Sequence, residues 1–131
     1  MSLTGSFMKP HESDPFEPGI FCDVHGTLVS PERPDLVDYL NRQYEAGKRV
    51  TIFSSNSEDA VNDIAHLNLH PDLKNNVQPK GVFIGRVLDV IIDDHDPSDA
   101  LLMCRTHLDP AKTDFQGLMP GKPGLPGPKT P

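Results

Sequence analysis

Polar side chains follow three short apolar runs of the chain, and their types are suited to chemistry on an anionic substrate. The first run ends in Asp23, the second is followed by Ser54 and Ser55, and the third by Asp93 and Asp94. Carboxylates can act as nucleophiles and as oxygen ligands of Mg²⁺, and hydroxyls can donate to phosphate oxygens. Short apolar runs bounded by turn signals are typical of buried strands, and open α/β sheets bind ligands beyond the carboxyl ends of their strands. We therefore expect these side chains to meet at one edge of a sheet.

The segments between these runs carry helix signals. Residues 34–46 have apolar side chains at helical spacing, Pro34 suits the first helical position, and Gly47 suits the C-terminal cap. A second helix is expected after a capping box formed by Ser55 and Glu58. The buried sides of the two helices are expected to carry Leu36, Val37, Leu40 and Tyr44 in the first, and Ala60, Val61, Ile64 and Ala65 in the second.

A third helix is expected after the third run, with Asp96 as its cap and Pro97 at its start. Its apolar part would be Leu101, Leu102 and Met103. The strands that alternate with these helices are expected over residues 20–23, 49–53 and 87–92. This alternation predicts an α/β fold with a mainly parallel central sheet covered by helices.

In their order along the chain, these motifs resemble those of the haloacid dehalogenase-like (HAD) superfamily, most of whose members are Mg²⁺-dependent phosphotransferases that form an aspartyl-phosphate. The likeness covers residues 20–107. The sequence Asp-Val-His-Gly-Thr at 23–27 is similar to the first HAD motif, Asp-x-Asp-x-Thr, with His25 in place of the second Asp. The resemblance implies a Rossmann-like three-layer α/β/α fold. The short intervals between the motifs indicate a member without a cap domain.

The other motifs follow downstream. Ser54, with Ser55 as a register alternative, is similar to the Ser or Thr of the second motif. Lys80 takes the place of the lysine of the third motif, and Asp93 and Asp94 are similar to the acidic pair of the fourth.

The resemblance implies a role for each position. Asp23 would be the nucleophile, and it would bind Mg²⁺ together with the Val24 carbonyl and one carboxylate of the acidic pair, with Asp93 preferred to Asp94. Lys80 would offset the negative charges of the nucleophile and the phosphate, which otherwise repel each other.

Other positions would contact or shape the phosphate site. Ser54 would hydrogen-bond the transferred phosphoryl group. Gly26 would let the backbone turn closely around it, and Thr27 would hold that loop through its hydroxyl. Arg86 is the alternative source of the positive charge assigned to Lys80.

His25 occupies the position that, in the family, protonates the leaving oxygen and then takes a proton from the hydrolytic water. Imidazole, with an ordinary pKa of about 6.5, is chemically suited to both steps. We therefore expect a Mg²⁺-dependent phosphomonoester hydrolase that acts through an aspartyl-phosphate on Asp23. The alternative is a protein that keeps the phosphate and metal site, hydrolyses little, and serves in binding or regulation.

The chain divides into three parts by composition. Residues 1–19 form a polar leader, residues 20–115 hold the expected catalytic domain, and residues 116–131 form a tail rich in proline and glycine. Because such a tail does not favour a helix or a strand, we expect it to be disordered or to pack on a partner. A third hypothesis is therefore an interaction module that works through this tail.

The formal net charge is −7, and the lysines and arginines are scattered. This pattern disfavours an extended nucleic-acid surface, so the expected partner is a small phosphorylated substrate or the phosphorylated end of a macromolecule. A homo-oligomer is one alternative, because a neighbouring subunit can close a site that has no cap domain. No signal sequence or membrane-spanning segment stands out, which favours a cytoplasmic protein.

Two pairs of residues have simpler explanations than chemistry. Cys22 and Cys104, expected in a strand and a helix, are interpreted as reduced core residues rather than a disulfide. His66 and His70 have i,i+4 spacing, but Pro71 indicates a helix end there and argues against a zinc site.

Overall fold

The computed structural model describes residues 16–119 of the chain. Their strands form one sheet in the order β3-β2-β1-β4-β5, and each neighbouring pair is parallel. The strands are β1 (Phe16–Cys22), β2 (Val50–Ser54), β3 (Gln78–Pro79), β4 (Val87–Ile92) and β5 (Met103–Leu108). The predicted α/β fold with a mainly parallel sheet is confirmed.

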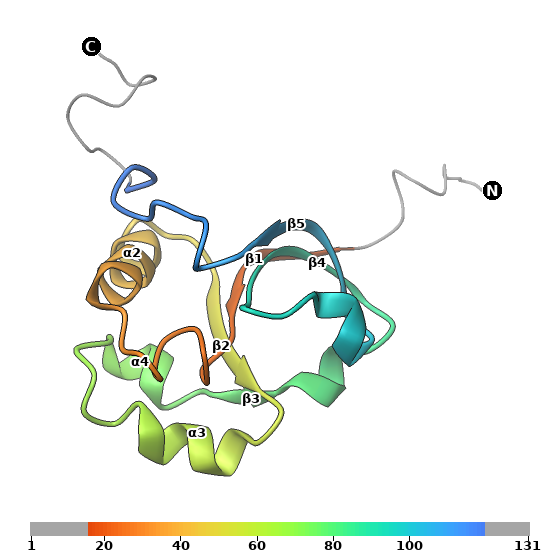
Figure 1. Ribbon diagram of the computed structural model, residues 1–131, viewed down its shortest axis with the longest axis horizontal. Coiled ribbons are helices and arrows are strands. Elements are labelled where there is room, and N and C mark those ends of the chain that lie inside the picture. The colour runs from red at the N-terminus through yellow and green to blue at the C-terminus, as the bar shows by residue number, and fades with distance from the viewer. Residues whose placement is uncertain (1–15, 120–131) are drawn as a thin grey trace.

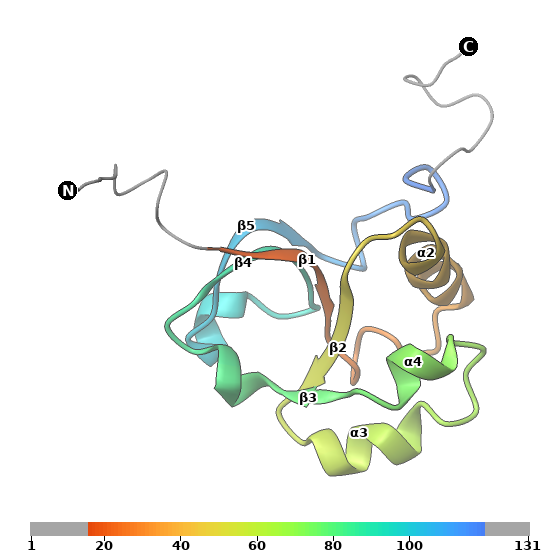
Figure 2. The same ribbon diagram turned by 180° about the vertical axis from the view of Figure 1, so that it is seen from behind.

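The α-helices lie together on one side of the sheet (Figures 1 and 2). They are α2 (Pro34–Glu45), α3 (Ser57–Asp63) and α4 (Pro71–Lys74). Leu36 and Leu40 of α2 and Ile64 after α3 are fully buried in one cluster with strand residues such as Ile52. As predicted, Pro34 opens α2, while Gly47 with φ +93° follows its C-terminal cap at Ala46.

The opposite side of the sheet is covered by two short 3₁₀ helices, η1 (Lys80–Phe83) and η2 (Pro97–Ala100). Phe83 packs on Phe21 with ring centroids 5.3 Å apart, and Leu102 completes the same buried cluster. Within residues 16–119 no α-helix covers this side, so one outer layer is thinner than a three-layer α/β/α arrangement implies.

The third predicted helix is wrong. η2 ends at Ala100, and its C-terminal cap Leu101 has φ +62°. Leu102 is buried, and Met103 begins β5 instead of continuing a helix. Cys104 therefore lies in a strand, and it is a free thiol, as is Cys22. The segment pairs with β4, and this tertiary pairing outweighs the helical spacing of its apolar residues.

The second predicted helix is present but shorter and capped differently. Asn56, not Ser55, is the N-cap, because its side chain accepts a hydrogen bond from the Asp59 amide at 3.2 Å. Val61 is exposed, and Ala65 is exposed beyond the helix end, so neither belongs to the buried side. Asp96 caps η2 as expected, accepting from the Ser98 amide.

The ordered fold extends beyond both predicted domain boundaries. β1 begins at Phe16, four residues before the expected start of the domain at Ile20. At the other end Met119 is buried in the α-helical cluster. The remaining residues of the predicted leader and tail, 1–15 and 120–131, lie outside the described part of the chain.

Candidate active site

Asp23, Lys80 and Asp93 meet at the carboxyl edge of the sheet. Asp23 follows β1, Lys80 follows β3, and Asp93 follows β4. The Lys80 ammonium lies 2.9 Å from Asp23 Oδ1 and 2.8 Å from Asp93 Oδ2. Asp23 and Asp93 are 6% and 1% exposed, so the ammonium is shared between two buried carboxylates. The sequence placed these three residues in one site, and the structure brings them together.

The loop after β1 is held against the loop after β4. The Thr27 hydroxyl lies 3.0 Å from Asp23 Oδ2, and it accepts a hydrogen bond from the Asp94 amide at 3.2 Å. Gly26 has φ +81°, and a Cβ there would lie 2.3 Å from Asp94 Oδ2. The backbone angle thus favours glycine, and a larger residue would also displace the Asp94 carboxylate.

Ser54 and Ser55 differ sharply in position. Ser54 is buried at the end of β2, and its Oγ accepts a hydrogen bond from the Asn56 amide at 3.1 Å. Because a hydroxyl carries one hydrogen, Ser54 keeps that hydrogen to donate. Ser55 is exposed and does not cap α3. This placement favours Ser54 over Ser55 as the phosphate contact.

The charges in the site do not balance. Burial, followed by the repulsion of Asp93, raises the pKa of Asp23, although Lys80 and Thr27 act in the opposite direction. Burial lowers the pKa of Lys80, but its contacts with Asp93 and Asp23 outweigh this effect and raise it overall. The site therefore holds more carboxylates than its lysine neutralises.

This donor set fits a hard divalent cation. Mg²⁺ prefers oxygen ligands and is usually held by one or two carboxylates with several waters. Asp23 and Asp93 supply buried carboxylates, and a cation would supply the missing positive charge. Asp94 lies farther out, and its carboxylate is 3.4 Å from the Thr27 hydroxyl.

The Val24 carbonyl is occupied by the chain itself, which argues against the ligand role predicted for it. Its oxygen accepts three backbone hydrogen bonds, from the amides of Thr27, Leu28 and Val29 at 3.2, 2.8 and 3.1 Å. A carbonyl oxygen has two lone pairs, so these amides leave none for a metal ion. This oxygen closes the turn after β1 instead.

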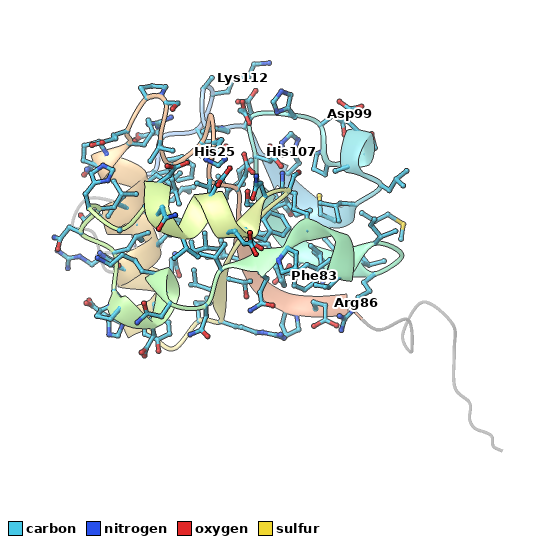
Figure 3. All side chains as sticks on the ribbon, turned by 90° about the horizontal axis from the view of Figure 1, so that it is seen from below. His25, Phe83, Arg86, Asp99, His107 and Lys112 are labelled. Atoms are coloured by element: carbon cyan, nitrogen blue, oxygen red, sulfur yellow. The ribbon has the colours of Figure 1, made fainter. Side chains whose placement is uncertain are left out.

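His25 lies at the rim of the site and pairs with α3. Its Nε2 lies 2.6 Å from Asp63 Oδ2, and both side chains are about half exposed. Figure 3 shows His25 on the same side of the molecule as His107, across from Arg86 and Phe83. The loop after β1 thus presents an imidazole two residues after Asp23, and the partner of this imidazole is a carboxylate of α3.

Arg86 is not an alternative to Lys80. It precedes β4 and pairs with Glu17 of β1, at the amino edge of the sheet (Figure 3). At about 3.3 Å per residue, the strand separates it from the active edge by roughly 20 Å.

Two further histidines lie near the site, and the sequence interpretation missed one of them, His107. His107 of β5 lies with its Nε2 2.9 Å from the Asp93 carbonyl. The His95 amide donates to Asp93 Oδ1 at 3.0 Å, and its ring lies 3.1 Å from Asp94 Oδ1. A prediction of β5 would have located His107 near the site. The sequence of β5 is mixed and polar, so it does not show a strand pattern. Ligand atoms of Asp93, Asp94 and His95 all lie within 4.8 Å of one another, so this corner also suits a cation.

The other histidine pair has structural roles. His66 Nε2 lies 2.5 Å from Glu32 Oε2, and His70 Nδ1 accepts a hydrogen bond from the Asp72 amide as the N-cap of α4. Their separate partners agree with the helix end inferred from Pro71, which is the first residue of α4.

Comparisons with protein-family models, with curated proteins and with solved structures gave no match. Across the described residues, no helix is both long enough and apolar enough to cross a membrane.

Proposed function

We propose that this chain is a Mg²⁺-dependent phosphomonoester hydrolase of the HAD-like type, with Asp23 as the nucleophile. The observation that carries the proposal is the Lys80 ammonium held between Asp23 and Asp93 at 2.9 and 2.8 Å. Phosphoryl transfer to a carboxylate brings two anions together, so the site must supply positive charge at the point of attack. Lys80 supplies part of it, and Asp93 gives a second carboxylate for a cation.

In the first step, a carboxylate oxygen of Asp23 attacks the phosphorus atom of the substrate. A P–O bond to Asp23 forms, the bond to the leaving oxygen breaks, and His25 donates a proton to that oxygen. Lys80 and Thr27 each hold one oxygen of the Asp23 carboxylate, which orients the nucleophile. A bound Mg²⁺ would add neutralisation of the phosphoryl oxygens.

In the second step, water attacks the phosphorus atom of the aspartyl-phosphate. His25 takes a proton from the water, the P–O bond to Asp23 breaks, and phosphate leaves. The Ser54 hydroxyl is placed at the end of β2 to donate to a phosphoryl oxygen. The Asp63 carboxylate lies 2.6 Å from His25 Nε2 and orients the imidazole.

Phosphate release from a panel of phosphomonoesters tests this function. We expect turnover with Mg²⁺, and a loss of at least about a thousandfold in Asp23→Asn because the nucleophile is gone. Asp99→Asn is the matched control, since Asp99 lies exposed on η2. Turnover in Asp23→Asn equal to that of the control would refute the proposal.

The second candidate is a phosphate- and metal-binding protein with little turnover, and the position of His25 favours it. The imidazole is directed to Asp63 on α3 at the exposed rim. If His25 does not reach the leaving oxygen, the site binds phosphate without completing hydrolysis. No turnover in the wild type and a gain of turnover in His25→Asp would support this candidate. Turnover that is lost in His25→Asp would support the hydrolase.

For the hydrolase we propose a small phosphorylated substrate or the phosphorylated end of a macromolecule. A net charge of −7 does not attract a polyanion over a large surface, whereas one terminal phosphate needs only Lys80 and a cation. We also propose that the protein is cytoplasmic. In a homo-oligomer, a second subunit would close the site.

A further inference from the structure

A hollow of about 450 Å³ lies beside α2, away from the candidate active site. Its lining includes three carboxylates, those of Glu32, Asp35 and Asp38. Val37 and Leu67, each 7% exposed, contribute apolar surface, and Gln116 lines one side. The hollow thus combines a small apolar floor with acidic walls.

The acidic walls are only partly neutralised by the surrounding residues. Arg33 donates to both oxygens of Asp35, at 3.0 and 2.8 Å. His66, which also lines the hollow, lies with its Nε2 2.5 Å from Glu32, and Arg42 lies 3.5 Å from Asp38. No lysine or arginine lines the hollow itself among residues 16–119. The pairs of Glu32 and Asp38 are exposed, and exposed pairs contribute little, so these two carboxylates still favour a cation in the hollow.

The residues that follow the described part of the chain carry positive charge, opposite to that of the hollow. Met119 is the last described residue, and the segment leading to it, drawn in blue, runs beside α2 in Figures 1 and 2. Residues 120–131 contain Lys122, Lys129 and one larger apolar residue, Leu125, but no aspartate or glutamate. Gln116 lines the hollow, and it lies three residues before the end of the described part of the chain at Met119.

We propose that residues 120–131 bind in this hollow of their own chain, with the lysine ammonium groups toward the carboxylates of Glu32 and Asp38 and Leu125 toward Val37 and Leu67. The proposal is independent of the phosphatase proposal. A segment tethered beside its site has a high effective concentration, so a few weak contacts suffice. Its prolines reduce the conformational entropy that binding removes.

The test compares backbone amide signals by NMR in the full chain and in Lys122→Glu. Lys112→Glu is the matched control, because Lys112 is an exposed lysine that does not line the hollow (Figure 3). We expect Lys122→Glu, and not the control, to shift the amide signals of Asn41, Asn68 and Gln116. Raising NaCl to about 1 M should shift the wild-type signals in the same direction, because the screening length falls to about 3 Å.

A charge swap gives the second arm of the test. Asp38→Lys should displace the segment, and combining it with Lys122→Glu should restore signals close to those of the wild type. Equal effects of Lys122→Glu and Lys112→Glu, or no recovery in the swap, would overturn the proposal. Signals that change on tenfold dilution of the wild type would also overturn it, because the hollow would then bind the tail of a second copy.

Discussion

At the scale of single residues, Lys80 stabilises the site because its ammonium is shared by two buried carboxylates. We predict that Lys80→Met lowers the free energy of unfolding of the metal-free protein by about 3–5 kcal/mol, since Asp23 and Asp93 would then face each other unpaired. Urea unfolding in EDTA measures this loss. Lys112→Met, at an exposed position, should change the value by less than about 0.5 kcal/mol. Equal losses in both variants would contradict the assigned role of Lys80.

The pH dependence of stability follows from Asp23. Burial, and then Asp93, raises its pKa in the folded protein, so the folded state holds the Asp23 proton more tightly than the unfolded state. The contribution of Asp23 to stability is therefore complete below its unfolded pKa of about 3.9, and it is lost as the pH rises through the folded pKa.

We predict that Asp23→Asn stabilises the metal-free protein by about 0.5–2 kcal/mol at pH 7, because the variant no longer buries that charge. The gain should shrink as the pH falls toward 4. Urea unfolding of both proteins in EDTA at several pH values gives the comparison. If the gain in the free energy of unfolding instead grew as the pH fell, the pKa of Asp23 would not be raised in the folded protein.

At the scale of elements, the loop after β1 depends on Gly26. Gly26→Ala places a side chain at φ +81° and within 2.3 Å of Asp94 Oδ2, whereas Gly47 has φ +93° and no atom within 4 Å of the place a methyl group would take. Both substitutions should cost about 1–2 kcal/mol of stability through the backbone angle. Only Gly26→Ala should also weaken Mg²⁺ binding, measured by calorimetry, because Asp94 must move. Equal Mg²⁺ affinities in the two variants would argue against this packing.

The turn between η2 and β5 offers a stabilising substitution. Leu101 has φ +62° and is 67% exposed, so its side chain gains little burial in a conformation that disfavours leucine. Asparagine tolerates this conformation, and we predict that Leu101→Asn raises the free energy of unfolding by about 0.5 kcal/mol. Thermal unfolding should show a higher midpoint temperature, and a lower one would contradict the assigned strain.

The elements that the sequence predicted well are those with strong local signals. β4 is an apolar run ending before Asp93, and α2 carries both its apolar face and its Pro34 start signal. β3 has only two residues, one of them Pro79, and β5 is an edge strand with a largely exposed, polar sequence. Their pairing comes from neighbouring strands, which local patterns do not encode, so Cys104 and His107 were misplaced or missed.

The site shows the same division between local and tertiary information. The ends of the apolar runs predicted that Asp23 and Asp93 lie close together. The third motif predicted that Lys80 lies beside both of them. The Val24 carbonyl oxygen accepts from the amides of Thr27 to Val29, and its direction depends on how the turn closes, which the motif does not contain. The pairing of His25 with Asp63 depends on how α3 packs, which the spacing of the motif does not contain.

At the scale of the whole molecule, a cation should couple to global stability, because its proposed ligands Asp23 and Asp93 follow β1 and β4 and lie far apart in the chain. We predict that Mg²⁺ at about 100 times its Kd raises the free energy of unfolding by roughly 2.7 kcal/mol. Asp93→Asn should abolish this increase, and Asp99→Asn should keep it. Thermal unfolding with Mg²⁺ or with EDTA measures the effect. If Mg²⁺ raised the free energy of unfolding of Asp93→Asn as much as that of the wild type, Asp93 would not be a metal ligand.

The central claim is that Asp23 becomes covalently phosphorylated, and mass spectrometry of the protein after acid quenching during turnover tests it most directly. The protein should gain the mass of one phosphoryl group in the presence of Mg²⁺ and a phosphomonoester, and peptide mapping should place that group on Asp23. Asp23→Asn should not gain it. Turnover without any phosphorylated protein at the earliest quench times, or a phosphoryl group on another residue, would contradict the account.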